Sequence, residues 1–134
     1  MDFLLYISTP KKIYADDPQI RPLYLTKGLL TGGFLYFPSG AAGTLHFIAR
    51  IGLHQIVPYN VGQNYRLDDC VIPFSLGITL DEPPFCIDCI TWNESISHPH
   101  ALTVCFFLKP SLKKKFSFSA VKDVFSGTNG YSKP

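Results

Sequence analysis

The chain has 134 residues and a formal net charge of +2. Charged residues make up 16% of it, below the roughly 25% of an average soluble domain, and aromatic residues reach 14%. This length supports one folded domain, and the composition excludes a disordered chain. No apolar run approaches the ~18 residues of a membrane-spanning helix, so the sequence predicts no membrane span. The low charge also argues against a small, freely soluble monomer.

The first 22 residues are expected to form an extended N-terminal arm. A secretory signal needs a basic start and an apolar core of about 7–15 residues, whereas an acidic residue stands at position 2, so we expect no signal peptide. Prolines at positions 10, 18 and 22 keep the segment out of a helix. A short apolar run predicts one strand, formed by Phe3, Leu4, Leu5, Tyr6 and Ile7.

Two placements of this strand are open at the level of sequence. A short apolar strand can add to the exposed sheet edge of a neighbouring subunit, which would make residues 3–7 an assembly arm. It can equally pair with the sheet of its own chain, because sequential elements are commonly adjacent in space.

Residues 23–108 consist of strand-like segments separated by turn signals. The pattern predicts strands over residues 29–37, 44–51, 54–57, 70–76, 85–92 and 102–108. Pro73 favours an edge strand or a bulge for the fourth of these. No amphipathic helical stretch is present and the connections are short, so the pairing should be antiparallel. We therefore predict a single all-β, jelly-roll-like antiparallel β-sandwich.

Residues 109–134 form a basic C-terminal tail. Six lysines oppose one aspartate there, a charge of +5, whereas residues 1–108 carry six Lys and Arg against nine Asp and Glu, a charge of −3. Lys113, Lys114 and Lys115 precede Phe116 and Phe118. Such a cluster predicts contact with nucleic acid, through phosphate neutralisation and base stacking. The alternative is a solvated tail whose phenylalanines dock on a neighbouring partner protein or on the sandwich of the same chain.

The spacing of Cys86 and Cys89 raises a zinc or redox site as an alternative. A strand over residues 85–92 puts the two side chains on opposite faces, because their separation is odd. They could then share neither a metal ion nor a disulfide. A single pair at this spacing is also insufficient for a zinc site. We therefore expect buried, reduced cysteines, no metal and no cofactor.

A ligand-binding module is the other alternative to a structural protein. The polar loop over residues 59–69 and the turn after residue 92 would contact a sugar or a surface receptor. The residues expected in that site are Tyr59, Asn60, Trp92, Asn93 and His98. Catalysis is less favoured, since the chain has neither a nucleophile elbow nor a phosphate-binding glycine loop.

Several short segments lie in and between the predicted strands: residues 37–43 (Phe-Pro-Ser-Gly-Ala-Ala-Gly), 54–60, 67–69 and 92–94, together with His100. On these segments, residues 31–108 resemble the small β-sandwich structural proteins of phages and other viruses. It implies a virion location and a non-enzymatic capsid, decoration or connector subunit. Low charge and high aromatic content suit surfaces buried in an assembly. We therefore expect a homo-oligomer that also contacts other virion proteins.

Overall fold

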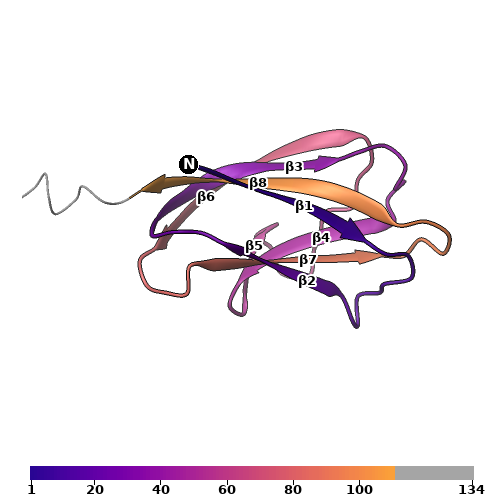
Figure 1. The fold of residues 1–134 in the computed structure, drawn as a ribbon, viewed down its shortest axis with the longest axis horizontal. Coiled ribbons are helices and arrows are strands. Elements are labelled where there is room, and N and C mark those ends of the chain that lie inside the picture. Colours follow the sequence, from indigo (N-terminus) through magenta and orange to yellow (C-terminus); the bar gives the residue numbers. More distant parts are fainter. Residues whose placement is uncertain (111–134) are drawn as a thin grey trace, which may run out of the picture.

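Alternation of inward and outward side chains builds eight strands within residues 1–110, which are the residues that the computed structural model describes. The strands are β1 (Asp2–Thr9), β2 (Gln19–Tyr24), β3 (Gly28–Phe37), β4 (Leu45–Ile51), β5 (His54–Val57), β6 (Cys70–Leu80), β7 (Cys86–Asn93) and β8 (His100–Pro110). They form two four-stranded layers (Figure 1). The first sheet has the order β1-β8-β3-β6 and the second β2-β7-β4-β5. The prediction of an all-β antiparallel sandwich is confirmed.

Strand pairing follows a nested pattern. β1 pairs with β8, β2 with β7, β3 with β6 and β4 with β5, each pair antiparallel. The described chain is therefore one long hairpin rolled across both layers, and every connection except that between β4 and β5 passes from one sheet to the other.

The core lies between the two sheets and draws on every strand pair. On β4, Leu45, Phe47 and Ala49 point inward, as the period of two predicted. Burying one large apolar side chain contributes about 1.5–3 kcal/mol relative to exposure. The largest side chains that are fully buried are Phe37, Phe47, Phe106, Ile7, Leu30, Leu35, Leu45, Ile56, Ile87, Leu102, Leu108 and Val57.

The N-terminal segment belongs to the sandwich, which differs from the extended arm expected over residues 1–22. β1 pairs with β8 over its whole length. Within this chain the strand therefore pairs with the chain's own sheet, which was the second of the two placements left open by the sequence. Phe3, Leu5 and Ile7 face the core, whereas Leu4 and Tyr6 face outward. β2 was not expected as a strand. It lies at the edge of the second sheet, where Pro22 needs no hydrogen-bonded N–H on its free side.

β1 and β2 form one edge of the first and second sheets, and β6 and β5 form the other edge of these same sheets. Pro73 therefore lies on an edge strand, as expected, and β6 continues to Leu80, four residues beyond the predicted end. The register between β3 and β6 shifts between Leu30 and Gly32. At the end of the described residues, Lys109 and Pro110 extend β8 rather than starting the tail. Residues 111–134, with Lys113, Lys114, Lys115, Phe116 and Phe118, lie outside the described residues.

Candidate interaction surface

The outer surface of the first sheet carries apolar side chains from all four strands. The register places Tyr6 beside Thr103, Thr103 beside Tyr36, and Tyr36 beside Val71. A second row runs from Leu4 through Cys105 and Phe34 to Pro73. We call this surface the outer apolar face and define it by Leu4, Tyr6, Phe34, Tyr36, Val71 and Phe107.

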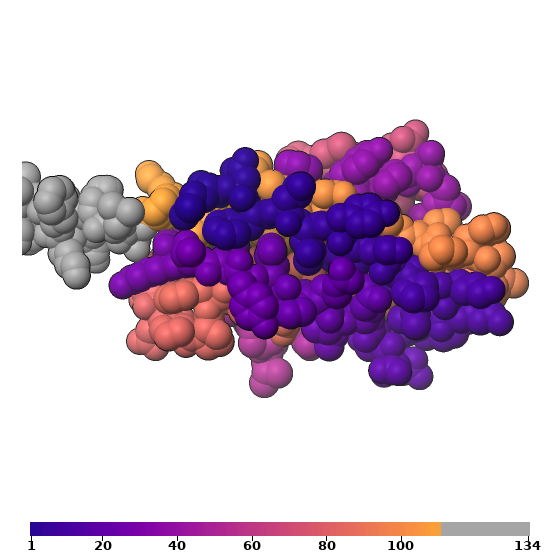
Figure 2. Space-filling model, in the orientation of Figure 1, coloured from indigo at the N-terminus to yellow at the C-terminus, as the bar shows by residue number. Residues whose placement is uncertain are grey.

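Most of the outer apolar face is open to solvent. The exposed fractions are 63% for Leu4, 62% for Tyr6, 39% for Tyr36, 57% for Val71 and 37% for Phe107. Figure 2 shows the residues of β1, in indigo, at the surface of the upper layer. An antiparallel sheet with one solvated face normally alternates apolar inward and polar outward residues. This sheet is apolar on both faces, which is typical of a surface that is covered in an assembly.

The centre of the face is already packed. The rings of Phe34 and Phe107 lie 6.2 Å apart between centroids. Cys105, between Leu4 and Phe34, is only 3% exposed. Burial, and secondarily the negative charge of Asp2, raises the pKa of its thiol. Because the thiol stays neutral at physiological pH, it adds no charge to this row.

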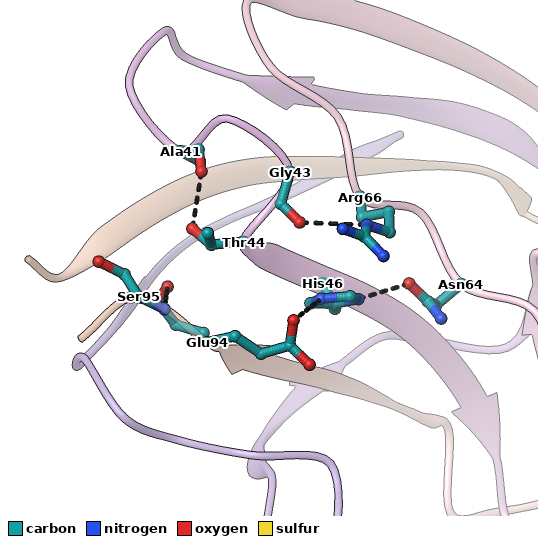
Figure 3. Close-up of polar contacts among 9 residues, drawn as sticks. Ala41, Gly43, Thr44, His46, Asn64, Arg66, Glu94 and Ser95 are labelled. Atoms are coloured by element: carbon teal, nitrogen blue, oxygen red, sulfur yellow. Dashed lines mark hydrogen bonds and ion pairs between the residues drawn. The ribbon is translucent and has the colours of Figure 1, made fainter.

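The second sheet carries a polar cluster on its outer surface, centred on His46 of β4 (Figure 3). His46 is only 4% exposed. Its Nδ1 lies 2.7 Å from Oδ1 of Asn64, and its Nε2 lies 3.2 Å from Oε1 of Glu94. The Trp92 ring stacks on the imidazole, with 4.9 Å between centroids and 9° between planes. Both ring nitrogens of His46 are thus engaged by neighbouring polar side chains.

Backbone pairing between the 59–69 loop and β4 positions Asn64 beside His46. Tyr65 exchanges two backbone hydrogen bonds with Phe47, at 2.9 and 3.0 Å, where β5 is too short to cover β4. Asn64 therefore lies above His46, and Arg66 donates from Nε to the carbonyl of Gly43. Both ring nitrogens of His46 are engaged and one face of its ring is covered by Trp92. His46 therefore anchors the 59–69 loop to β4 rather than facing a substrate.

A second hydrogen-bonded anchor lies at the end of the same loop. The carboxylate of Asp68 accepts the backbone N–H groups of Gly40, at 2.8 Å, and Ala42, at 3.1 Å. The hydrogen bond from Ala42, followed by those of its neighbours, holds the pKa of Asp68 below its ordinary value. Ala42 has φ of 50° and Gly40 has φ of 122°, so this turn adopts left-handed backbone that the carboxylate holds in place.

The five residues expected in a ligand site occupy different environments. Trp92 covers His46, and His98 is exposed with its Nδ1 beside the hydroxyl of Ser97. Tyr59 and Asn60 are exposed at the end of β5, where the Tyr59 ring meets His54 edge-on at 5.7 Å. Within residues 1–110, no hydrogen bond or ring contact joins Tyr59 or Asn60 to the other three.

Asn93, the remaining member of that set, is fully buried and holds backbone together. Its Nδ2 donates to the carbonyls of Thr9 and His98, and its Oδ1 accepts the N–H of Ser95. All of its polar side-chain atoms are engaged inside the fold, so it offers no group to a ligand.

The cysteine pair lies on opposite faces of β7, as its spacing predicted. Cys89 is fully buried in the core, whereas Cys86 is partly exposed. Burial raises the pKa of the Cys89 thiol to about 12, with smaller effects from Asp88 and Cys86. All four cysteines are free thiols. In the part of the chain that the structure describes, no three His, Cys, Asp or Glu side chains gather as a metal site would require.

Residues 1–110 contain no helix with the length and apolarity of a membrane crossing. Comparison of the chain with protein-family models, with curated proteins and with solved structures gives no match.

Proposed function

We propose that the chain is a non-enzymatic structural subunit that self-associates, and that two copies meet through the outer apolar face. The observation that carries this proposal is the continuity of exposed apolar side chains across β1, β8, β3 and β6. An isolated exposed apolar residue is ordinary on a protein surface, but a contiguous patch across a whole sheet favours an interface.

The size of the patch suits a stable dimer. Scaled by their exposed fractions, with about 200 Å² for each whole aromatic side chain and about 150 Å² for Leu4 and for Val71, the five exposed members of the face offer on the order of 450 Å² of apolar surface. Two copies would thus cover about 900 Å². Because interfaces are about 60% apolar, the total would be about 1,500 Å², within the range of roughly 1,200–2,000 Å² for specific interfaces.

A sheet surface is also suited to pairing with itself. A two-fold axis through the face brings the same rows of side chains together from both copies, which is the commonest symmetry of oligomers. Aromatic residues supply three of the five exposed members, and buried aromatic side chains dominate the binding energy of interfaces.

The virion setting is part of the same proposal. Its support is the sequence resemblance over residues 31–108, together with the nested pairing of eight strands in two sheets of four within residues 1–110. That pairing fits a jelly roll, an architecture found in viral capsid domains and also in lectins. Because one fold serves several functions, the surface chemistry carries more of the argument than the architecture.

The test measures molar mass in solution over a range of concentrations, by light scattering and sedimentation. We expect the unaltered chain to be at least dimeric, and Tyr6→Asp to raise the dissociation constant by about tenfold or more. The matched control is Tyr24→Asp, because Tyr24 is a 70% exposed tyrosine on the edge strand of the other sheet. It should leave the dissociation constant unchanged.

Three results would contradict the proposal. A chain that stays monomeric at every concentration rules out self-association. An oligomer that tolerates Tyr6→Asp but dissociates with Tyr24→Asp assembles through the second sheet. A Tyr6→Asp variant with the same dissociation constant as the unaltered chain would show that the outer apolar face is not the interface between copies.

A further inference from the structure

The sandwich is open along the side where β5 and β6 face each other. An open groove of about 880 Å³ lies there, and residues from both sheets line it. From the first sheet come Phe74, Leu76 and Ile78 of β6, and from the second come Ile56, Val57 and Tyr65. β5 and β6 each pair with a neighbouring strand on one side only, so both present a free backbone edge to this groove.

A difference in strand length opens the groove. β5 has four residues and β6 has eleven, so β5 covers only part of the inward surface of β6. The inward residues of β6 before Leu80 are consequently only half-buried, whereas Leu35 on β3 and Val104 on β8 are fully buried. Apolar side chains in contact with the core thus remain partly exposed beside an unpaired strand edge, which is the usual acceptor for an added strand.

The chain itself contains a segment with the matching pattern. Residues 116–120 read Phe-Ser-Phe-Ser-Ala, which alternates apolar and polar side chains with the period of a strand. We propose that residues 116–121 of the same chain add to the free edge of β6 and place Phe116 and Phe118 in the groove. This proposal does not depend on self-association through the outer apolar face.

The reach and the direction of the chain agree with this docking. Pro110 at the end of β8 lies beside Gly28, and Gly28 lies beside Leu80 at the end of β6. The position beyond β6 is therefore three strand spacings from β8, or about 14 Å. Residues 111–115 can span up to about 17 Å. β8 runs parallel to β6, so a segment that turns back would run antiparallel to β6.

Charge favours the same path. The connecting residues include Lys113, Lys114 and Lys115. To pass from β8 to the far side of β6 they must cross the end of β6, where Asp81 and Glu82 follow Leu80 as exposed residues. The connection also crosses the start of β3, where Lys27 is exposed, so the three lysines pass one positive and two negative charges. The net attraction favours docking at modest ionic strength.

The test is hydrogen exchange measured by mass spectrometry on the full chain. The double variant Phe116→Asp/Phe118→Asp should exchange about tenfold or more faster than the unaltered chain in peptides covering β6 and residues 54–60, because docking protects the edge amides. The matched control is Val124→Asp/Phe125→Asp, which makes the same change in charge and also removes two apolar side chains further along the tail. It should match the unaltered chain.

Equal exchange in the unaltered chain and in the Phe116→Asp/Phe118→Asp variant would overturn the proposal. So would faster exchange at β6 in the control variant, since the docked segment would then be a different one. The difference in protection between the unaltered chain and the Phe116→Asp/Phe118→Asp variant should also be equal at two protein concentrations that differ tenfold, because self-association through the outer apolar face would affect both chains alike. A difference that rises with concentration would show that the segment comes from another copy and would refute docking within the chain.

Discussion

Replacing Asn93 tests whether this residue is structural, as its contacts indicate, or part of a ligand site, as the sequence suggested. Asn93→Ala removes three hydrogen bonds: two that its Nδ2 donates to carbonyl oxygens, at 3.2 and 3.0 Å, and one that its Oδ1 accepts, at 3.1 Å. Thr9, which supplies one of the carbonyls, is fully buried. A buried polar group without a partner costs about 1–3 kcal/mol.

The expected loss follows from that cost. The Thr9 carbonyl contributes about 1–3 kcal/mol, and the contacts with His98 and Ser95, nearer to solvent, add about 1 kcal/mol together. Asn93→Ala should therefore lower the free energy of unfolding by about 2–4 kcal/mol. At this chain length, about 3 kcal/mol corresponds to a decrease in Tm of about 10 °C. Asn93→Asp should lose at least as much, since its carboxylate would face two carbonyl oxygens.

Chemical denaturation followed by circular dichroism measures this loss, with Asn60→Ala as the control. Asn60 is exposed, and its side chain makes no hydrogen bond within residues 1–110, so the control should stay within about 0.5 kcal/mol of the unaltered chain. If Asn93→Ala also stays within about 0.5 kcal/mol, the buried hydrogen bonds do not hold β1 and β7 together, and the structural interpretation of Asn93 is wrong.

Three further outcomes are expected. The lowered pKa of Asp68 stabilises the fold above the carboxyl's unfolded pKa, so Asp68→Asn should be less stable at pH 7, and the deficit should shrink below about pH 4 as Asp68 protonates; a deficit independent of pH would contradict this. Cys89 should resist alkylation at pH 8 until the protein unfolds, as peptide mass spectrometry would show; rapid labelling of the folded chain would refute its burial. Gly33→Ala should cost about 3 kcal/mol or more, because its Cβ would overlap the carbonyl oxygen of Cys105, whereas Gly77→Ala, with no atom within 4 Å, should be neutral within about 1 kcal/mol by thermal unfolding.

Much of the fold was predictable because local signals are strong in this sequence. Alternation over residues 44–51 and turn residues at 38–40 and 58–64 mark strands and their ends without any knowledge of the partners. β2 was missed for a physical reason. Only Leu23 of its six residues is buried, and Pro22 suggested an interruption, although an edge strand accommodates proline.

The surfaces were less predictable, because they depend on register between distant strands. Leu4, Tyr36 and Val71 lie in three separate segments, and nothing local shows that they share one face. The cluster around His46 is similar: Asn64 and Glu94 are 18 and 48 residues away from it in the chain. The odd spacing of Cys86 and Cys89, by contrast, was sufficient to predict that their side chains lie on opposite faces of β7.

The nested strand order also determines how this domain can fold. β1 pairs with β8, so its register joins Asp2 to Phe107, and the amino group of Met1 donates to the carbonyl of Leu108 at 2.6 Å. During synthesis β1 cannot gain this partner until the chain extends past residue 107. Among the eight strands of residues 1–110, only β4 and β5 are adjacent in sequence and paired in one sheet. Contacts between such distant residues slow folding, so the β4–β5 hairpin is the natural place to nucleate, with each outer pair closing in turn and β1 with β8 last.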